Sequence, residues 1–178
     1  MKEEKKIFGE ERRQCILQWL KESNEPLTGA ELAAKTNVSR QVIVQDISLL
    51  KARNEPIIAT SQGYLYLKTP AKHETYTRVV ACFHTPEQTK EELYLIVDHG
   101  VTVKDVKIEH PVYGDLTASV MVSNRREVDQ FIQKIKETNA SYLLQLTDGT
   151  HLHTLEADSL VKLEAAYFAL QQAGFLIE

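Results

Sequence analysis

Residues 28–43 read TGAELAAKTNVSRQVI, and this stretch decides the fold of the N-terminal part of the chain. Thr28 and Glu31 have the spacing of a capping box, which predicts that a short helix begins here. Asn37-Val38 follows as a tight turn, and Ser39 is of the residue type that caps the N-terminus of a further helix. Two short helices joined by so few residues predict a helix-turn-helix.

The sequence on both sides of this stretch adds a helix and a hairpin. Apolar residues at helical spacing predict a first helix over 11–23, and the helix that starts after Ser39 is expected to end near Arg53. Two short β-type runs at 56–60 and 64–67 are joined by a turn that contains a glycine, which predicts a hairpin. A hairpin in this place is the wing of a winged helix-turn-helix.

Polar side chains near the start of the third helix are the candidates for contact with DNA. In helix-turn-helix proteins the equivalent helix enters the major groove, where its N-terminal residues contact base edges. We expect Asp46, on the same helix, to face that region and to repel phosphate. The alternative interpretation is that these polar residues only solvate an exposed helix face. The candidate DNA-binding residues are Thr28, Ser39, Arg40, Gln41, Gln45, Gln62 and Tyr64.

Charge and composition indicate a cytoplasmic protein whose N-terminal part meets a polyanion. Residues 1–70 hold 11 Lys and Arg against 9 Asp and Glu, whereas residues 71–178 hold 10 against 16. This difference makes the N-terminal part the better partner for DNA. The sequence has no apolar run long enough to span a membrane and no visible secretory signal. Cys15 and Cys82 are far apart in sequence, and we expect both to be small buried apolar residues.

A linker is expected at 69–74, and it divides the chain into domains 1–69 and 70–178. The second domain has the pattern of an α+β fold, a β-α-β-β-α-β sandwich of the ferredoxin-like kind that is extended by a strand and a helix. Its last two strands are expected to pair across Asp148-Gly149, a dipeptide that favours two-residue turns. The expected strands lie at 76–83, 101–109, 116–122, 141–147 and 150–155, and the expected helices at 86–98, 125–138 and 159–173.

Histidines are concentrated in this second domain. In the run 150–154, His151 and His153 lie two residues apart on an expected strand, so both imidazoles project from one face. His84 directly precedes a helix whose start is marked by a second capping box, and Glu92 lies further along that helix. Imidazole and carboxylate are ligands of zinc, nickel and similar divalent ions, so one interpretation is a metal site. The other is a polar strand face beside a solvated helix.

Three segments that contain these histidines resemble the signature segments of the 3H domain. They are CFHTPEQTKEEL at 82–93, HPVYG at 110–114 and GTHLHTL at 149–155. The segments LTGAELA at 27–33 and VSRQVI at 38–43 resemble a winged helix-turn-helix of the biotin-repressor type. A winged helix that is followed directly by a 3H domain resembles the niacin-responsive transcriptional repressors.

This resemblance implies a function and a set of site residues. It implies a homodimeric repressor of genes for NAD biosynthesis or salvage and for niacin uptake, with nicotinic acid as corepressor. It also implies one divalent metal ion per subunit, nickel or zinc, both of which accept imidazole and carboxylate ligands. Glu91 and Glu87 stay open as alternatives for the carboxylate. The implied metal ligands are His84, Glu92, His151 and His153.

Several further expectations concern the effector and the partner subunit. His110 and Tyr113 are candidates to line the nicotinate pocket, although His110 is equally well explained as a structural residue. A dimer is expected to bind a pseudopalindromic operator. The alternative functions are a metal-sensing repressor and, less favoured because no general base is apparent, a metal-dependent hydrolase. The last helix has an apolar stripe that suits either the dimer surface or the core of its own domain, formed by Leu160, Leu163, Tyr167 and Leu170.

Overall fold

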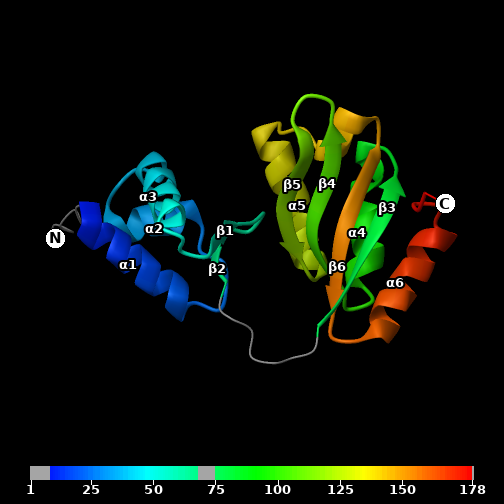
Figure 1. The fold of residues 1–178 in the computed structure, drawn as a ribbon, viewed down its shortest axis with the longest axis horizontal. Coiled ribbons are helices and arrows are strands. Elements are labelled where there is room, and N and C mark those ends of the chain that lie inside the picture. The colour runs from blue at the N-terminus through cyan, green and yellow to red at the C-terminus, as the bar shows by residue number, and fades with distance from the viewer. Residues whose placement is uncertain (1–8, 68–74, 178) are drawn as a thin grey trace. The chain divides into compact units, whose positions relative to one another are not determined.

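The computed structural model describes residues 9–67 and 75–177, and the chain falls into two compact units, Met1–Pro70 and Ala71–Glu178 (Figure 1). The expected linker at 69–74 lies outside the described residues. The boundary between residues 69 and 70 therefore stays a prediction. None of the described helices combines the length and the apolar character that crossing a membrane requires.

The N-terminal unit has the predicted order of three helices and a hairpin. The helices are α1 (Gly9–Glu22), α2 (Gly29–Thr36) and α3 (Arg40–Ala52), and the strands are β1 (Ile57–Ala59) and β2 (Tyr64–Tyr66). The Thr28 hydroxyl accepts the Glu31 N–H at 3.1 Å, while the Glu31 carboxylate accepts the Thr28 N–H at 2.7 Å. Asn37 ends α2 with a φ of 51°, and the Ser39 side chain accepts the N–H of Val42. These contacts confirm the predicted helix-turn-helix.

An apolar core joins the helices and the hairpin of this unit. Each helix contributes side chains from one face, at the spacing that the sequence pattern predicts. The core therefore holds α3 with one face inward and leaves its other face in solvent, as a DNA-reading helix requires. The buried residues are Ile16, Leu20, Leu32, Ala33, Ile43, Ile47, Leu50 and Ile57.

The C-terminal unit is the predicted α+β domain. Its strands are β3 (Tyr76–Phe83), β4 (Thr102–His110), β5 (Gly114–Val122) and β6 (Thr150–Ala157); its α-helices are α4 (Thr89–Val97), α5 (Arg125–Thr138) and α6 (Leu160–Gln172); its 3-10 helices are η1 (Pro86–Gln88) and η2 (Leu143–Thr147). The strands form one sheet in the order β3-β6-β4-β5. Buried side chains from the sheet and from all three α-helices share one core, so the helices pack on one face of the sheet (Figure 1).

One detail of the predicted topology is wrong. Residues 141–147 do not form a strand that pairs with 150–155: a 3-10 helix, η2, takes their place, and β6 pairs with β3 and β4 on its two sides. Tyr142 starts η2 because its N–H is bonded to the Gln145 side chain at 2.8 Å, a local contact that competes with strand pairing. All neighbouring strands described in this unit are antiparallel, and β6 lies between β3 and β4, which is a split β-α-β arrangement of the ferredoxin-like kind.

Candidate metal centre and nucleic-acid interface

Four side chains of the C-terminal unit converge in its interior. The Nε2 atoms of His84, His151 and His153 lie 2.8, 3.3 and 3.3 Å from the carboxylate oxygens of Glu92. None of the four residues is more than 4% exposed. The structure thus brings together the residues that the sequence singled out as metal ligands, from a strand, a helix and the segment between another strand and that helix.

The sheet register and the packing of α4 explain this convergence. His151 and His153 on β6 lie opposite Cys82 and Val80 on β3, so both imidazoles point to the helix-covered face of the sheet. The apolar side of α4, Leu93, Ile96 and Val97, is buried in the core and brings Glu92 to the same face. His84 directly follows β3. The capping box formed by Thr85 and Gln88 then starts η1.

Each imidazole has its second nitrogen held by a backbone carbonyl. Nδ1 of His84, His151 and His153 donates to the carbonyl oxygens of Thr85, Gly149 and Asp105 at 2.8, 2.9 and 2.7 Å. A carbonyl oxygen and an ionised carboxylate both only accept, so without an ion the rings share protons with Glu92. With an ion bound, Nδ1 would keep its proton and the lone pair of Nε2 would face the ion. Metal-binding histidines are oriented in this way.

The donor set therefore fits a divalent cation. Bonds of about 2.0–2.2 Å at tetrahedral angles separate neighbouring ligand atoms by roughly 3.4 Å, close to the spacing between these imidazole nitrogens and carboxylate oxygens. Three neutral imidazoles and one carboxylate suit zinc or nickel in their chemistry. His84, Glu92, His151 and His153 could hold such an ion, since all three imidazoles meet the carboxylate of Glu92.

Electrostatics in the cluster follows from burial and from the contacts with Glu92. Burial alone would raise the pKa of Glu92, but the three surrounding imidazoles hold that pKa well below its ordinary value. Burial alone would lower the pKa of His84 and of His153, but the Glu92 carboxylate raises both. A cation would take the place of the protons that these imidazoles share with Glu92, so ion uptake should release protons.

The structure distinguishes the three candidate carboxylate ligands by their burial and places a thiol beside the histidine cluster. Glu92 is fully buried in the cluster, whereas Glu87 and Glu91 are exposed and line a surface hollow beside Tyr94. Cys82 is buried as predicted, but it is more than an apolar filler, since its Sγ lies within 4.8 Å of donor atoms of Glu92 and His151. Burial and Glu92 raise the pKa of the Cys82 thiol. Cys82 lies opposite His151 in the strand register, a pairing that residue spacing along the chain does not indicate.

The proposed nicotinate-lining residues lie in the turn between β4 and β5. Nδ1 of His110 accepts the N–H groups of Val112 and Tyr113 at 3.1 and 3.2 Å. The Tyr113 side chain is 75% exposed, and its ring centroid lies 5.0 Å from that of His110. These contacts give His110 a structural role in closing the turn, and a role in ligand binding stays a prediction.

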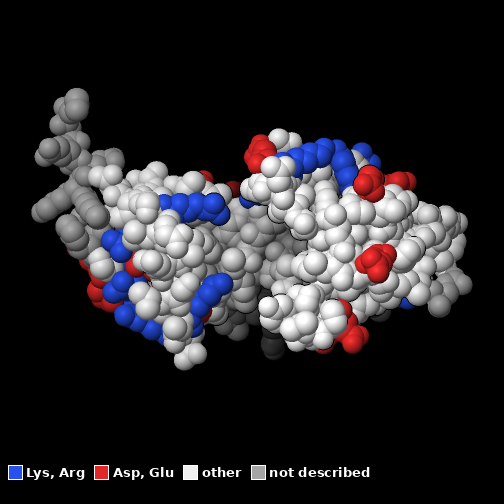
Figure 2. Space-filling model, turned by 90° about the horizontal axis from the view of Figure 1, so that it is seen from above, with Lys and Arg blue, Asp and Glu red and all other residues white. Residues whose placement is uncertain are grey.

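In the N-terminal unit, the candidate base-reading residues lie on the open face of α3. Arg40, Gln41 and Gln45 are exposed, and Ser39 caps the same helix. Figure 2 shows the basic side chains of this unit in several separate groups on the viewed face. The hydroxyl of Thr28 already bonds the Glu31 carboxylate, at 2.7 Å, which limits its use for phosphate.

The candidate DNA-binding residues of the wing are only partly exposed. Gln62 and Tyr64 are both half-buried, and Tyr64 packs against the apolar core of the unit. Their contact with DNA stays a prediction. By contrast, the exposed face of α3 offers several polar side chains in a row.

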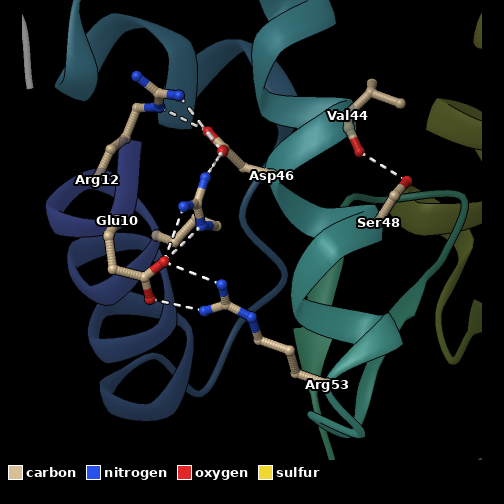
Figure 3. Close-up of polar contacts among 7 residues, drawn as sticks. Glu10, Arg12, Val44, Asp46, Ser48 and Arg53 are labelled. Atoms are coloured by element: carbon tan, nitrogen blue, oxygen red, sulfur yellow. Dashed lines mark hydrogen bonds and ion pairs between the residues drawn. The ribbon is translucent and has the colours of Figure 1, made fainter. Parts of the chain in front are cut away.

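The prediction for Asp46 is wrong, because this residue points away from the DNA-reading face. Its side chain is 3% exposed and lies between α3 and α1 (Figure 3). Its carboxylate accepts bonds from Arg12 at 2.6 Å and from Arg13 at 3.1 Å. Arg13 continues to Glu10, which also binds Arg53 at the end of α3 and has its pKa lowered to about 2 by Arg53 and Arg13. The network fixes α3 against α1 rather than repelling phosphate.

Comparison with known proteins agrees with this two-part architecture. The sequence profile of the 3H domain matches residues 77–178, and a helix-turn-helix domain profile matches residues 12–65. The transcription repressor NadR of Bacillus subtilis is 64% identical over 179 residues, which cover 100% of this chain and 99% of NadR. The chain belongs to the 3H-domain family of transcription repressors.

A second relative of this 3H-domain repressor has a lower sequence identity and also matches over nearly its whole length. The probable transcription repressor NiaR of Thermotoga maritima is 40% identical over 173 residues, which cover 97% of each chain. The family resemblance that the sequence segments indicate is thereby confirmed. Since both relatives are named as transcription repressors and the chain carries a DNA-binding domain, the 3H-domain repressor is a regulator and not an enzyme.

The exposed face of α3 predicts which substitutions weaken DNA binding. In the 3H-domain repressor, Arg40→Ala and Gln41→Ala should each weaken operator binding by about 1–3 kcal/mol, because each removes a base contact. Fluorescence anisotropy with operator and scrambled DNA at physiological salt measures the effect.

Lys51→Ala is the matched control, since Lys51 lies at the far end of the same helix. It should weaken binding to both DNA sequences alike. Unchanged operator binding by Arg40→Ala would contradict the assignment of α3 as the reading helix.

Proposed function

We propose that this chain is a dimeric, cytoplasmic repressor of genes for NAD biosynthesis or salvage and for niacin uptake. In this proposal nicotinic acid is the corepressor, and each 3H domain holds one divalent metal ion, nickel or zinc. The observation that carries the proposal is the buried cluster of His84, Glu92, His151 and His153 in a regulator whose other unit reads DNA. The strong match to repressors named NadR and NiaR supports it.

The chain's own residues define what the cluster can do. His84, His151 and His153 offer imidazole nitrogens, and Glu92 offers negative charge that offsets part of the charge of a divalent ion. The carbonyl bonds to Nδ1 keep the three rings in place before any ion arrives, which lowers the cost of binding. When bound, the ion supplies a fixed positive charge inside the effector domain. Because imidazoles bind metal only when deprotonated, uptake should weaken as the pH falls.

Nicotinic acid acts in this proposal through an equilibrium between conformations. An effector shifts an equilibrium only by its difference in affinity for the two states. Nicotinate must therefore bind more tightly to the arrangement of the dimer in which both α3 helices fit the operator. The same coupling requires operator DNA to raise the affinity for nicotinate by the same factor.

Operator binding measured with and without each effector tests the proposal. Full-length protein is freed of metal with a chelator and titrated onto operator DNA with no addition, with metal alone, with nicotinate alone and with both. The proposal expects high affinity only with both. Equal binding with metal alone would make the ion itself the signal, a second candidate function that the burial of the cluster favours. Binding that responds to neither addition would overturn both functions.

The oligomeric state gives a separate prediction. A homodimer should protect a pseudopalindromic operator whose half-sites are centred about 10 base pairs apart or a multiple of that, because its two reading helices face the same side of the duplex. Footprinting together with sedimentation measures this. A single asymmetric half-site occupied by a monomer would contradict it.

The apolar stripe of α6 lies mainly in the core of its own domain. Leu163 and Leu170 are buried in the core of their own unit, and Tyr167 packs partly against that core. Leu160 is exposed, at 56%. The stripe therefore belongs mainly to the fold of the domain, and the dimer surface stays a matter for experiment.

A further inference from the structure

We propose that Gly149 is a positioning residue of the histidine cluster and that no residue with a larger side chain can replace it. This inference rests on the proposed metal function and names a determinant of it outside the four ligands. Gly149 lies between η2 and β6, two residues before His151. It contacts the segment that carries His84, so one backbone position connects two of the three imidazoles.

The carbonyl of Gly149 holds both segments. Its oxygen accepts the Nδ1–H of His151 at 2.9 Å and the backbone N–H of His84 at 3.4 Å. The first bond fixes the ring tautomer that turns Nε2 of His151 toward Glu92. The second continues the pairing of β3 with β6 beyond Phe83 and Thr150, the last pair in register. A shift of this one peptide group therefore moves the ring of His151 and the backbone of His84 together.

The other side of Gly149 has no space for a side chain. A Cβ atom there would lie 2.6 Å from the carbonyl oxygen of His84 and 3.2 Å from the ring of Phe83. The Phe83 ring is 56% exposed and can turn away, but the His84 oxygen belongs to the backbone and leads directly into the capped start of η1. The φ of Gly149, 104°, is also one that L-residues rarely adopt. A side chain at position 149 would therefore push apart the two segments that the backbone carbonyl of this residue joins.

Gly114 offers a matched control in the same domain. It also has a positive φ, 68°, so alanine there meets the cost of a left-handed position, although a smaller one than at the φ of 104° of Gly149. A Cβ atom on Gly114 would have no heavy atom within 4 Å. Gly114→Ala thus carries the strain of a left-handed position without any collision. The difference between the two variants reports the collision with His84 together with the less favourable φ of Gly149.

The first measurement is metal affinity of the full chain. Zn²⁺ and Ni²⁺ are titrated in competition with a chromophoric chelator into wild type, Gly149→Ala and Gly114→Ala. Residues that orient metal ligands typically contribute 10–100-fold to affinity, so Gly149→Ala should lose about that factor. Gly114→Ala should bind as wild type does. Equal affinities of wild type and Gly149→Ala would overturn the inference.

The second measurement needs no metal and separates this inference from the proposed function. Nitrogen NMR of the histidine rings in metal-free protein at mildly alkaline pH should place the proton of His151 on Nδ1 in wild type and Gly114→Ala. In Gly149→Ala this preference should be lost. If wild type binds no metal yet the tautomer depends on Gly149, the metal function fails and the positioning role stands. An unchanged tautomer in Gly149→Ala would overturn the positioning role. Loss of cooperative unfolding in Gly149→Ala would overturn it as well, since the effect would then not be specific to the imidazoles.

Discussion

A His153→Ala variant should retain no metal at concentrations that saturate the wild type, and should lose nicotinate-dependent operator binding with it. His153 contributes one of three imidazole nitrogens around Glu92, and its own Nδ1 is held by the carbonyl of Asp105. Residues that merely orient a ligand are worth about 10–100-fold in affinity, so removal of a ligand should cost more than about 100-fold. The truncation also leaves the Glu92 carboxylate in the interior with less compensating charge.

Metal content after gel filtration and operator titrations with nicotinate measure this result. His99→Ala is the matched control, because Nδ1 of His99 bonds the Leu95 carbonyl at the end of α4, 2.7 Å away, and belongs to no part of the cluster. That variant should keep its metal. Weak DNA binding without effectors should survive in His153→Ala, since the winged helix has its own core. A His153→Ala protein that still responds fully to nicotinate would remove the metal from the mechanism.

Local signals in the sequence predicted most elements of this fold because their causes are local. The capping boxes at Thr28 and Thr85 depend on residues three positions apart, and the structure contains both. The bounds of β3 and α5 coincide with the predicted ranges. By contrast, the hairpin expected across Asp148-Gly149 is wrong because a turn dipeptide does not determine which partner a strand finds. In the sheet, β6 lies between β3 and β4, and this choice depends on contacts distant in sequence.

The candidate metal residues show the same limit. Spacing placed His151 and His153 on one face of a strand and put His84 and Glu92 at a capped helix, and the family resemblance then implied these four residues as ligands. Only the register between β3 and β6 reveals that Cys82 joins them, since the two strands are far apart in the sequence. Asp46 is the clearest error of this kind. Its helical position is compatible with either face until α1 is packed against α3, and α1 brings the two arginines that bury its charge.

Asp46→Ala should destabilise the N-terminal unit by about 3–5 kcal/mol, the cost of removing one partner from a buried ion pair. The Asp46 carboxylate is 3% exposed and bonds the guanidinium groups of Arg12 and Arg13, whose side chains are 10% and 16% exposed. Its removal leaves two neighbouring cations in a region of low dielectric without the carboxylate that neutralises them. Asp46→Asn keeps the shape and one acceptor but not the charge. The stability of its N-terminal unit should lie between that of Asp46→Ala and that of the wild type.

Trp19 makes the effect measurable within the full chain. It is the only tryptophan, it lies on α1, and it packs against the core of the N-terminal unit, so its fluorescence in urea reports the unfolding of that unit. Glu10→Ala is the control, because Glu10 belongs to the same network (Figure 3) but its side chain is half exposed, and exposed pairs contribute little. It should unfold close to wild type, and metal affinity should be unchanged in both variants. If Asp46→Ala unfolds at the same urea concentration as Glu10→Ala, the buried pair does not stabilise the packing of α3 against α1.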